Sequence, residues 1–192
     1  MMPSGRVMVG PPEREPVSLE EAKHHLKEQD YYEDDTIRSL IKTARELSED
    51  RTWRAFITQT WDVYYDGFGD GLTIPMPPLQ EVVSVSYVDR DGASQELDPE
   101  SYAVDAHREP ATITAYRWPE VADVSSPITV RVTVGYGDEG ADVPDKYRSA
   151  IKLILGHLFM HREQVVTGAV PREVPWAAKM LLDVDHARVM SG

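Results

Sequence analysis

The sequence predicts an α+β fold: a small helical bundle, made of an N-terminal helix pair and a C-terminal helix, with an inserted antiparallel β subdomain. Hydrophobic residues recur with a period near 3.6 over residues 18–50 and 144–162, and with a period near 2 from about 58 to 136. A chain of 192 residues is long enough to build a core without disulfides. It contains no cysteine, which excludes disulfides, thiolate metal sites and cysteine nucleophiles.

The chain opens with a segment that we expect to be a flexible arm. Residues 1–16 contain four prolines and little periodic apolar content. Ser18 and Glu21 then have the spacing of a capping box, which predicts a helix over about 19–28.

A second helix is predicted from about residue 36, after the acidic residues 33–35, which favour a helix start. Its apolar residues form one stripe at helical spacing. The stripe comprises Ile37, Leu40, Ile41, Ala44 and Leu47. We expect the polar side of this helix to be solvated, and it carries Arg38, Lys42, Arg45 and Glu49.

The middle of the chain alternates between apolar and polar residues, as strands with one buried face do. Asp91 and Gly92 form a hairpin turn signal. The predicted strands span residues 60–65, 72–74, 83–87, 95–97, 102–104, 112–115 and 128–134.

The last third returns to the helical period, with a wide apolar stripe on a helix that ends near residue 163. Prolines and a glycine follow, so residues 165–192 are predicted to form a C-terminal arm that holds a short helix over 176–184. Residues 17–164 are expected to form a single domain.

Charge limits the functions that the chain can have. Acidic residues outnumber basic ones by 33 to 20, which gives a net charge of −13. A duplex-binding surface needs clustered Lys and Arg, so sequence-specific DNA binding is not expected. The N-terminus lacks the apolar core of a signal peptide and no stretch is long enough to span a bilayer, so we expect an intracellular protein without a membrane partner.

Two histidines have the spacing of a metal-binding pair. His157 and His161 lie four residues apart on the predicted third helix, but Leu158 stands where a zincin has glutamate, and no third ligand follows. The chain also lacks a P-loop and a G-x-S-x-G motif. We therefore predict no catalytic residue, no metal and no cofactor.

The C-terminal arm is the best candidate for a contact with another protein. Residues 143–192 carry seven basic and five acidic side chains, unlike the acidic middle of the chain. Trp176 can either anchor a partner or fold back onto the domain. The candidate interaction residues are Arg172, Trp176, Lys179, Met180 and Leu181.

An ordered series of segments resembles one known family. The series comprises V-S-L-E-E-A-K-x-H-L at 17–26, I-x-x-L-I-x-x-A-R at 37–45, T-Q-T-W at 58–61, I-P-M-P-P-L-Q-E-V-x-S-V at 74–85, Y-V-D-R-D-G at 87–92, V-T-V-G-Y-G-D at 132–138 and H-x-x-x-H-R-E-x-V-V-T-G at 157–168. It resembles the tailed-phage head–tail connector (adaptor) family, in the branch with a β insertion that also occurs in prophages and gene-transfer agents.

The resemblance implies a structural virion protein with no catalytic residues. Such a protein docks as a ring under the portal protein, twelve-fold in the family, and its subunits often stay monomeric in isolation. It receives a neck or tail-completion protein, and DNA passes through as cargo. The implied location is the virion neck, after assembly in the host cytoplasm.

Two other classes stay open at this point. One is a small acidic protein-interaction module that never forms rings. The other is a metal-dependent enzyme that uses His157 and His161 with an acidic partner.

Overall fold

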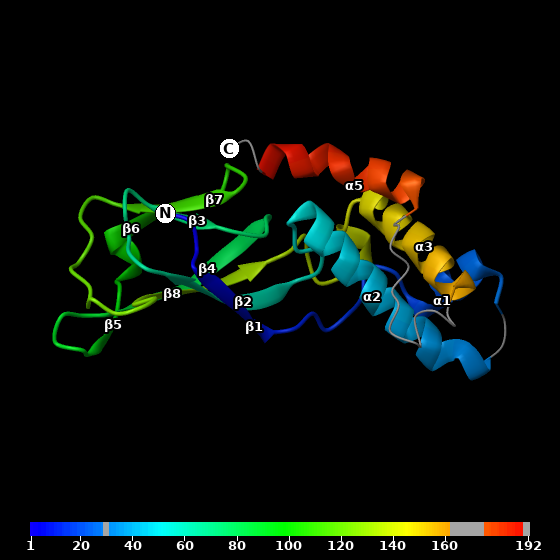
Figure 1. Ribbon diagram of the computed structural model, residues 1–192, viewed down its shortest axis with the longest axis horizontal. Coiled ribbons are helices and arrows are strands. Elements are labelled where there is room, and N and C mark those ends of the chain that lie inside the picture. Colours follow the sequence, from blue (N-terminus) through cyan, green and yellow to red (C-terminus); the bar gives the residue numbers. More distant parts are fainter. Residues whose placement is uncertain (29–30, 162–174, 190–192) are drawn as a thin grey trace. The chain divides into compact units, whose positions relative to one another are not determined.

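The computed structural model describes residues 1–28, 31–161 and 175–189, with side chains described up to residue 183 (Figure 1). The chain divides into two compact units. A β unit comprises residues 1–12 and 58–136, and a helical unit comprises residues 13–57 and 137–191. No helix in the described ranges is both long and apolar enough to cross a membrane.

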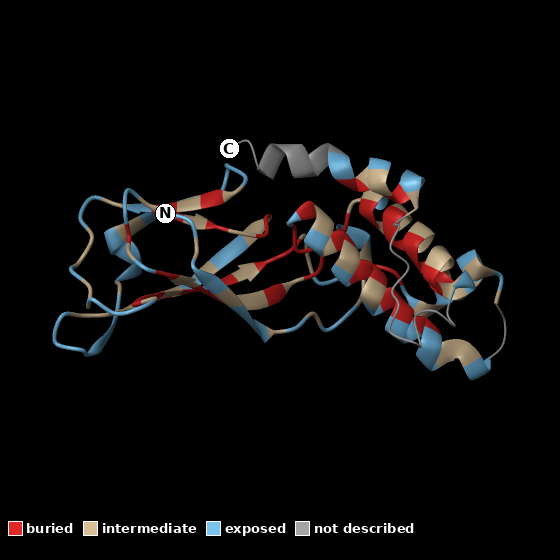
Figure 2. Ribbon diagram, viewed as in Figure 1, coloured by how far each residue is buried: buried red, intermediate tan, exposed pale blue. Residues whose placement is uncertain are grey.

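The helical unit contains the predicted helix pair and the predicted third helix. These are α1 (Leu19–Leu26), α2 (Asp34–Thr52) and α3 (Asp145–Met160), and α5 (Trp176–Val189) follows. Short 3-10 turns η1 (Tyr31–Glu33) and η3 (Gly140–Asp142) precede α2 and α3. The apolar stripes predicted from the sequence face inward, and Figure 2 shows these buried residues along α2 and α3. The fully or nearly fully buried side chains include Ile37, Leu40, Ile41, Ala44, Ile151, Ile154, Leu155 and Leu158.

The start of α1 has the predicted capping box. The Ser18 hydroxyl accepts a hydrogen bond from the Glu21 N–H at 3.1 Å, and the Glu21 carboxylate accepts one from the Ser18 N–H at 3.0 Å. The helix ends two residues earlier than predicted, because Lys27 adopts a left-handed conformation with φ of 58°. The capping box therefore fixes where α1 begins, and Lys27 fixes where it ends.

One expectation about α2 is wrong. Arg38 and Lys42 are exposed as predicted, but the Arg45 side chain is only 2% exposed. Its Nε donates to the Glu15 carboxylate at 2.8 Å, and its Nη1 donates to Glu49. Burial lowers the pKa of Arg45, but Glu49 and Glu15 outweigh that effect and raise it overall. Periodicity could not predict this burial, because Glu15 lies thirty residues away in the sequence.

The β unit contains two antiparallel sheets. The five-stranded sheet has the order β1-β2-β8-β4-β5, and the three-stranded sheet has the order β3-β7-β6. The first sheet comprises β1 (Gly5–Gly10), β2 (Gln59–Tyr65), β4 (Leu79–Val88), β5 (Ser94–Glu96) and β8 (Ile128–Val134). The second comprises β3 (Leu72–Ile74), β6 (Tyr102–Asp105) and β7 (Ala111–Ala115).

Strand β8 lies at the centre of the larger sheet. Val130 pairs with Val63 of β2 on one side and with Val85 of β4 on the other. All three side chains are fully buried, so they form the middle of the β core. On the opposite face, Arg131 donates two hydrogen bonds to Asp62, at 2.7 and 2.8 Å. The alternation predicted from the sequence therefore separates a core face from a charged face.

One feature of the β unit differs from the sequence prediction. Residues 5–10 are not a flexible arm but form β1, which pairs with β2. The prolines at 3, 11 and 12 flank this strand instead of interrupting it. Strand β3 forms over the predicted residues 72–74, and it pairs with β7.

Candidate interaction surface

Helix α5 has two different faces. Ala178 and Leu182 are fully buried, whereas Trp176 is 75% exposed and Met180 is 54% exposed. Trp176 and Met180 are four residues apart, so they lie on the same side of the helix. A helix with one apolar face in the core and large apolar side chains on another face offers a surface that a partner can cover.

The helix is held in the helical unit by charge as well as by packing. Arg51, near the end of α2, donates two hydrogen bonds to Asp183, at 2.6 and 2.9 Å. This interaction raises the pKa of Arg51. The helix predicted over 176–184 is therefore present, and its buried Ala178 and Leu182 show that it packs in the helical unit.

The predicted interaction residues are only partly brought together. Trp176 and Met180 share the exposed face, which we call the α5 face. Lys179 and Leu181 are half-buried beside it. Arg172 lies outside the described residues, so the structure does not test its prediction.

The two histidines do approach one another. The ring centroids of His157 and His161 are 4.4 Å apart, and Nδ1 of His161 lies 2.8 Å from the carbonyl oxygen of His157. The chain described at 1–28, 31–161 and 175–183 contains no group of three His, Cys, Asp or Glu residues that could hold a metal ion. The pair supplies two imidazoles, which is fewer ligands than the protein zinc sites commonly have.

A cleft of about 610 Å³ in the helical unit is lined by charges of both signs. Arg14 binds Glu139, and Arg148 binds Glu21 and the Pro16 carbonyl oxygen. These pairs neutralise one another and tie the segment before α1 to α3. The charged residues that line the cleft are therefore explained by their contacts with one another, and we assign no ligand to it.

Sequence reasoning missed one exposed aromatic pair. Tyr31 is 83% exposed and Tyr32 is 98% exposed, both in η1. The Lys23 ammonium lies 4.6 Å from the Tyr31 ring centroid and forms an ion pair with Asp34 at 2.6 Å. The available signal was two adjacent aromatic residues that lie outside the apolar stripes of both helices.

Comparison with known proteins identifies a fold and no sequence relative. No protein-family model matches the chain, and no curated protein matches it.

Three solved structures contain a chain with the same fold. One is the neck of an empty gene transfer agent (GTA) particle, computed with C6 symmetry, with a TM-score of 0.77, 18% identity and 94% coverage of both chains. Another is the virion of a native GTA particle, with a TM-score of 0.75, 18% identity and 93% coverage of both chains. The third is the neck of a native GTA particle, computed with C12 symmetry, with a TM-score of 0.70, 17% identity and 93% coverage of both chains. The chain is therefore similar, over nearly its whole length, to chains in the necks and virions of GTA particles.

Proposed function

We propose that this chain is a structural head–tail connector, which forms a ring in the neck of a phage-like or GTA-like particle. The observation that carries the proposal is the match over 94% of both chains at a TM-score of 0.77. A match of that extent includes residues of both the helical and the β unit, and so does not depend on one common motif. The proposed role is non-enzymatic.

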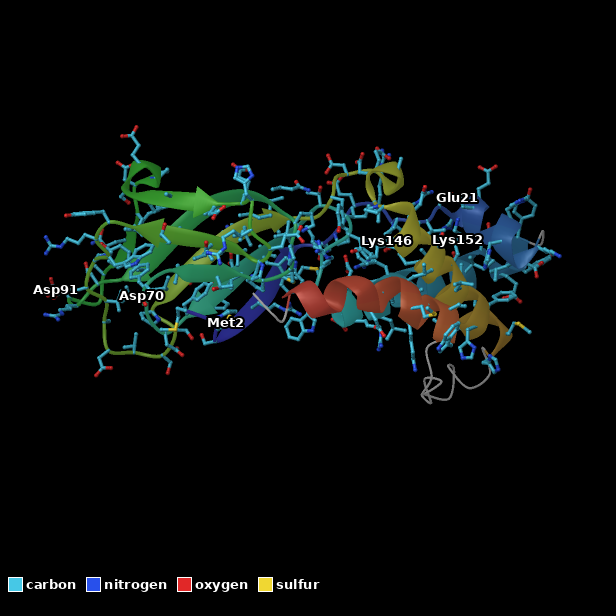
Figure 3. All side chains as sticks on the ribbon, turned by 90° about the horizontal axis from the view of Figure 1, so that it is seen from above. Met2, Glu21, Asp70, Asp91, Lys146 and Lys152 are labelled. Atoms are coloured by element: carbon cyan, nitrogen blue, oxygen red, sulfur yellow. The ribbon has the colours of Figure 1, made fainter. Side chains whose placement is uncertain are left out.

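The distribution of charge supports passage of DNA as cargo. Residues 58–136 carry thirteen acidic and four basic side chains and no lysine. Figure 3 labels two of these acidic residues, Asp70 and Asp91, in loops of the β unit. A surface without clustered cations cannot displace counterions from DNA, so a passing duplex would not be held.

The proposed partners are the portal protein, a neck or tail-completion protein, and other copies of this chain. We assign the portal contact to the α5 face, with Lys179, Leu181 and Arg172 beside it. Exposed tryptophan and methionine are typical of the anchors of protein interfaces. The α5 face meets that description, since Trp176 and Met180 are both more than half exposed.

The role is tested by deleting the gene from the particle-producing strain and counting particles by electron microscopy. We expect heads without tails, and restoration of tailed particles by the wild-type gene. Tailed particles in normal numbers after the deletion, or purified particles that lack the chain, would contradict the proposal.

The α5 face is tested by pull-down with purified portal protein. Trp176→Ala with Met180→Ala should weaken binding at least tenfold, because truncating an interface anchor costs about 2 kcal/mol or more. Met160→Ala is the matched control, since Met160 is 82% exposed in the same unit. Equal melting temperatures of the three proteins would show that binding, and not folding, has changed. Full binding by the double variant would exclude the α5 face.

A further inference from the structure

The larger sheet of the β unit is open. β1 forms one edge and β5 the other, and each pairs with a single strand. An edge strand presents unpaired N–H and C=O groups, to which another chain can add a strand.

The two edges of this sheet differ in length and polarity. β1 has six residues, and its exposed side chains are apolar: Val7 is 51% exposed, Met8 is 37% and Val9 is 45%. β5 has three residues, Ser94, Gln95 and Glu96, all exposed and none apolar. Because the edges are not alike, they suit a contact between unlike surfaces better than a two-fold contact between identical ones.

Charge points to the same pairing. Residues 1–12 contain one basic side chain, Arg6, and no acidic one. Residues 94–105, which begin with β5, contain four acidic side chains and no basic one. These acidic residues are Glu96, Asp98, Glu100 and Asp105. The β1 segment therefore carries no negative charge that would repel the acidic β5 edge of another copy.

We propose that β1 of one subunit adds to β5 of the next, so that the five-stranded sheets of neighbouring subunits join edge to edge around the ring. This inference rests on the proposed function. A head-to-tail contact between identical subunits can repeat from one copy to the next, and it forms a closed assembly when the subunits make a ring. Each neighbouring pair of strands in the sheet is antiparallel, so β1 and β5 run in the same direction. Subunits related by a small rotation would therefore pair these strands in parallel.

Cross-linking tests the contact, because this chain has no native cysteine and each thiol on it is therefore an introduced one. Val9→Cys and Gln95→Cys are introduced singly and together in the particle-producing strain. The purified particles are then treated with a short bis-maleimide. Within one subunit, β1 and β5 are four strand spacings apart, roughly 19 Å, so a short link must join two subunits.

The double variant should give a ladder of covalent oligomers, and each single variant should give monomers. Replacing Gln95→Cys by Val104→Cys, on an edge strand of the smaller sheet, is the control and should give no ladder. If the chain is present in the particles but only the Val104→Cys combination gives a ladder, or neither does, the β1–β5 contact is wrong. If the chain is absent from the particles, the proposed function itself has failed.

A charge substitution gives a second and independent readout. Val9→Glu would oppose the acidic β5 edge, and should reduce the yield of tailed particles at least tenfold. Val9→Lys should retain more of the yield, because it has the opposite sign at the same position. Val124→Glu is the matched control, since Val124 is 56% exposed in a loop of the same unit. Equal yields from Val9→Glu and Val124→Glu, with both chains folded, would overturn the pairing.

Discussion

The helical unit and the β unit of this protein use charge in different ways. The helical unit holds all six lysines and buries an arginine, Arg45, between two glutamates. The β unit has no lysine, and its exposed Arg90 pairs with Glu120 at 3.0 Å on the surface. The helical unit therefore buries a cation between two carboxylates, whereas the β unit buries a carboxylate, Asp62, whose partner Arg131 is 47% exposed, and leaves most of its other charges on the surface.

The largest effects should come from a carboxylate placed in either apolar core. Ile154→Asp in the helical unit and Val130→Asp in the β unit replace side chains that are 2% and 0% exposed. Each substitution should lower the free energy of unfolding by several kcal/mol, a large part of the about 5–15 kcal/mol that is usual for a folded protein. Circular dichroism melting measures the loss, with Met160→Asp as the exposed control. An unchanged melting temperature for Ile154→Asp would mean that α3 does not pack as described.

Arg45→Ala should lower the free energy of unfolding by about 3–5 kcal/mol, because it removes the cation that neutralises the largely buried Glu49 carboxylate. Arg90→Ala removes an ion pair whose two side chains are 69% and 70% exposed. Arg90→Ala should lower the free energy of unfolding by only about 0–1 kcal/mol. Urea denaturation of both variants sharpens the comparison of the two units. Similar losses of stability in Arg45→Ala and Arg90→Ala would contradict the difference between the two units.

Ser18→Ala removes the hydroxyl that accepts the Glu21 N–H. The expected loss is about 1 kcal/mol, the usual cost of deleting a helix cap. Thermal melting measures it, and Ser18→Asp should restore most of the stability because aspartate also caps helices. If Ser18→Ala melts like the wild type, the capping box does not contribute to stability.

Glu21→Gln should change how stability depends on pH. Hydrogen bonding to the Ser18 N–H, followed by the attraction of Arg148, lowers the pKa of Glu21 in the folded protein. A carboxylate with a lowered pKa contributes stability above its unfolded pKa of about 4.3, and this contribution is lost as the pH falls through the folded value.

The wild type should therefore lose more stability on acidification than Glu21→Gln does. Glu20→Gln is the control, because it removes the same charge from an exposed neighbour. Equal pH profiles for Glu21→Gln and the wild type would contradict the role of Glu21.

Metal removal should have the smallest effect. Dialysis against a chelator should leave the melting temperature unchanged, because His157 and His161 supply too few ligands for a structural zinc site. Stoichiometric zinc in the purified protein that disappears in His157→Ala would contradict this prediction.

The sequence predicted those parts of the fold that depend on local pattern. The capping box at Ser18, the stripe on α2 and the alternation of β8 follow from residues close together in the chain. The burial of Arg45 and the pairing of β1 with β2 depend on partners far away in the sequence. No periodicity could reveal these contacts.

The candidate interaction surface stays a prediction, and only the exposure of its residues can be compared with the structure. Trp176 and Met180 were identified from residue type and local charge, and both are exposed. Tyr31 and Tyr32 were missed, because their exposure follows from the short 3-10 turn that separates α1 from α2. The sheet edge at β1 could not be predicted from local pattern, since it exists only once β1 has paired with β2.

The Arg45 cluster has a mechanical consequence. Arg45 holds Glu15, near the point where the chain enters the helical unit after residue 12, and it also holds Glu49. Glu49 in turn accepts the Phe56 N–H at 2.7 Å, just before the chain leaves that unit after residue 57. One crossing of the backbone is thus anchored to α2 by the Arg45 guanidinium, and the other by the Glu49 carboxylate that Arg45 holds. Tension applied along either crossing would therefore act directly on hydrogen bonds made by side chains of α2.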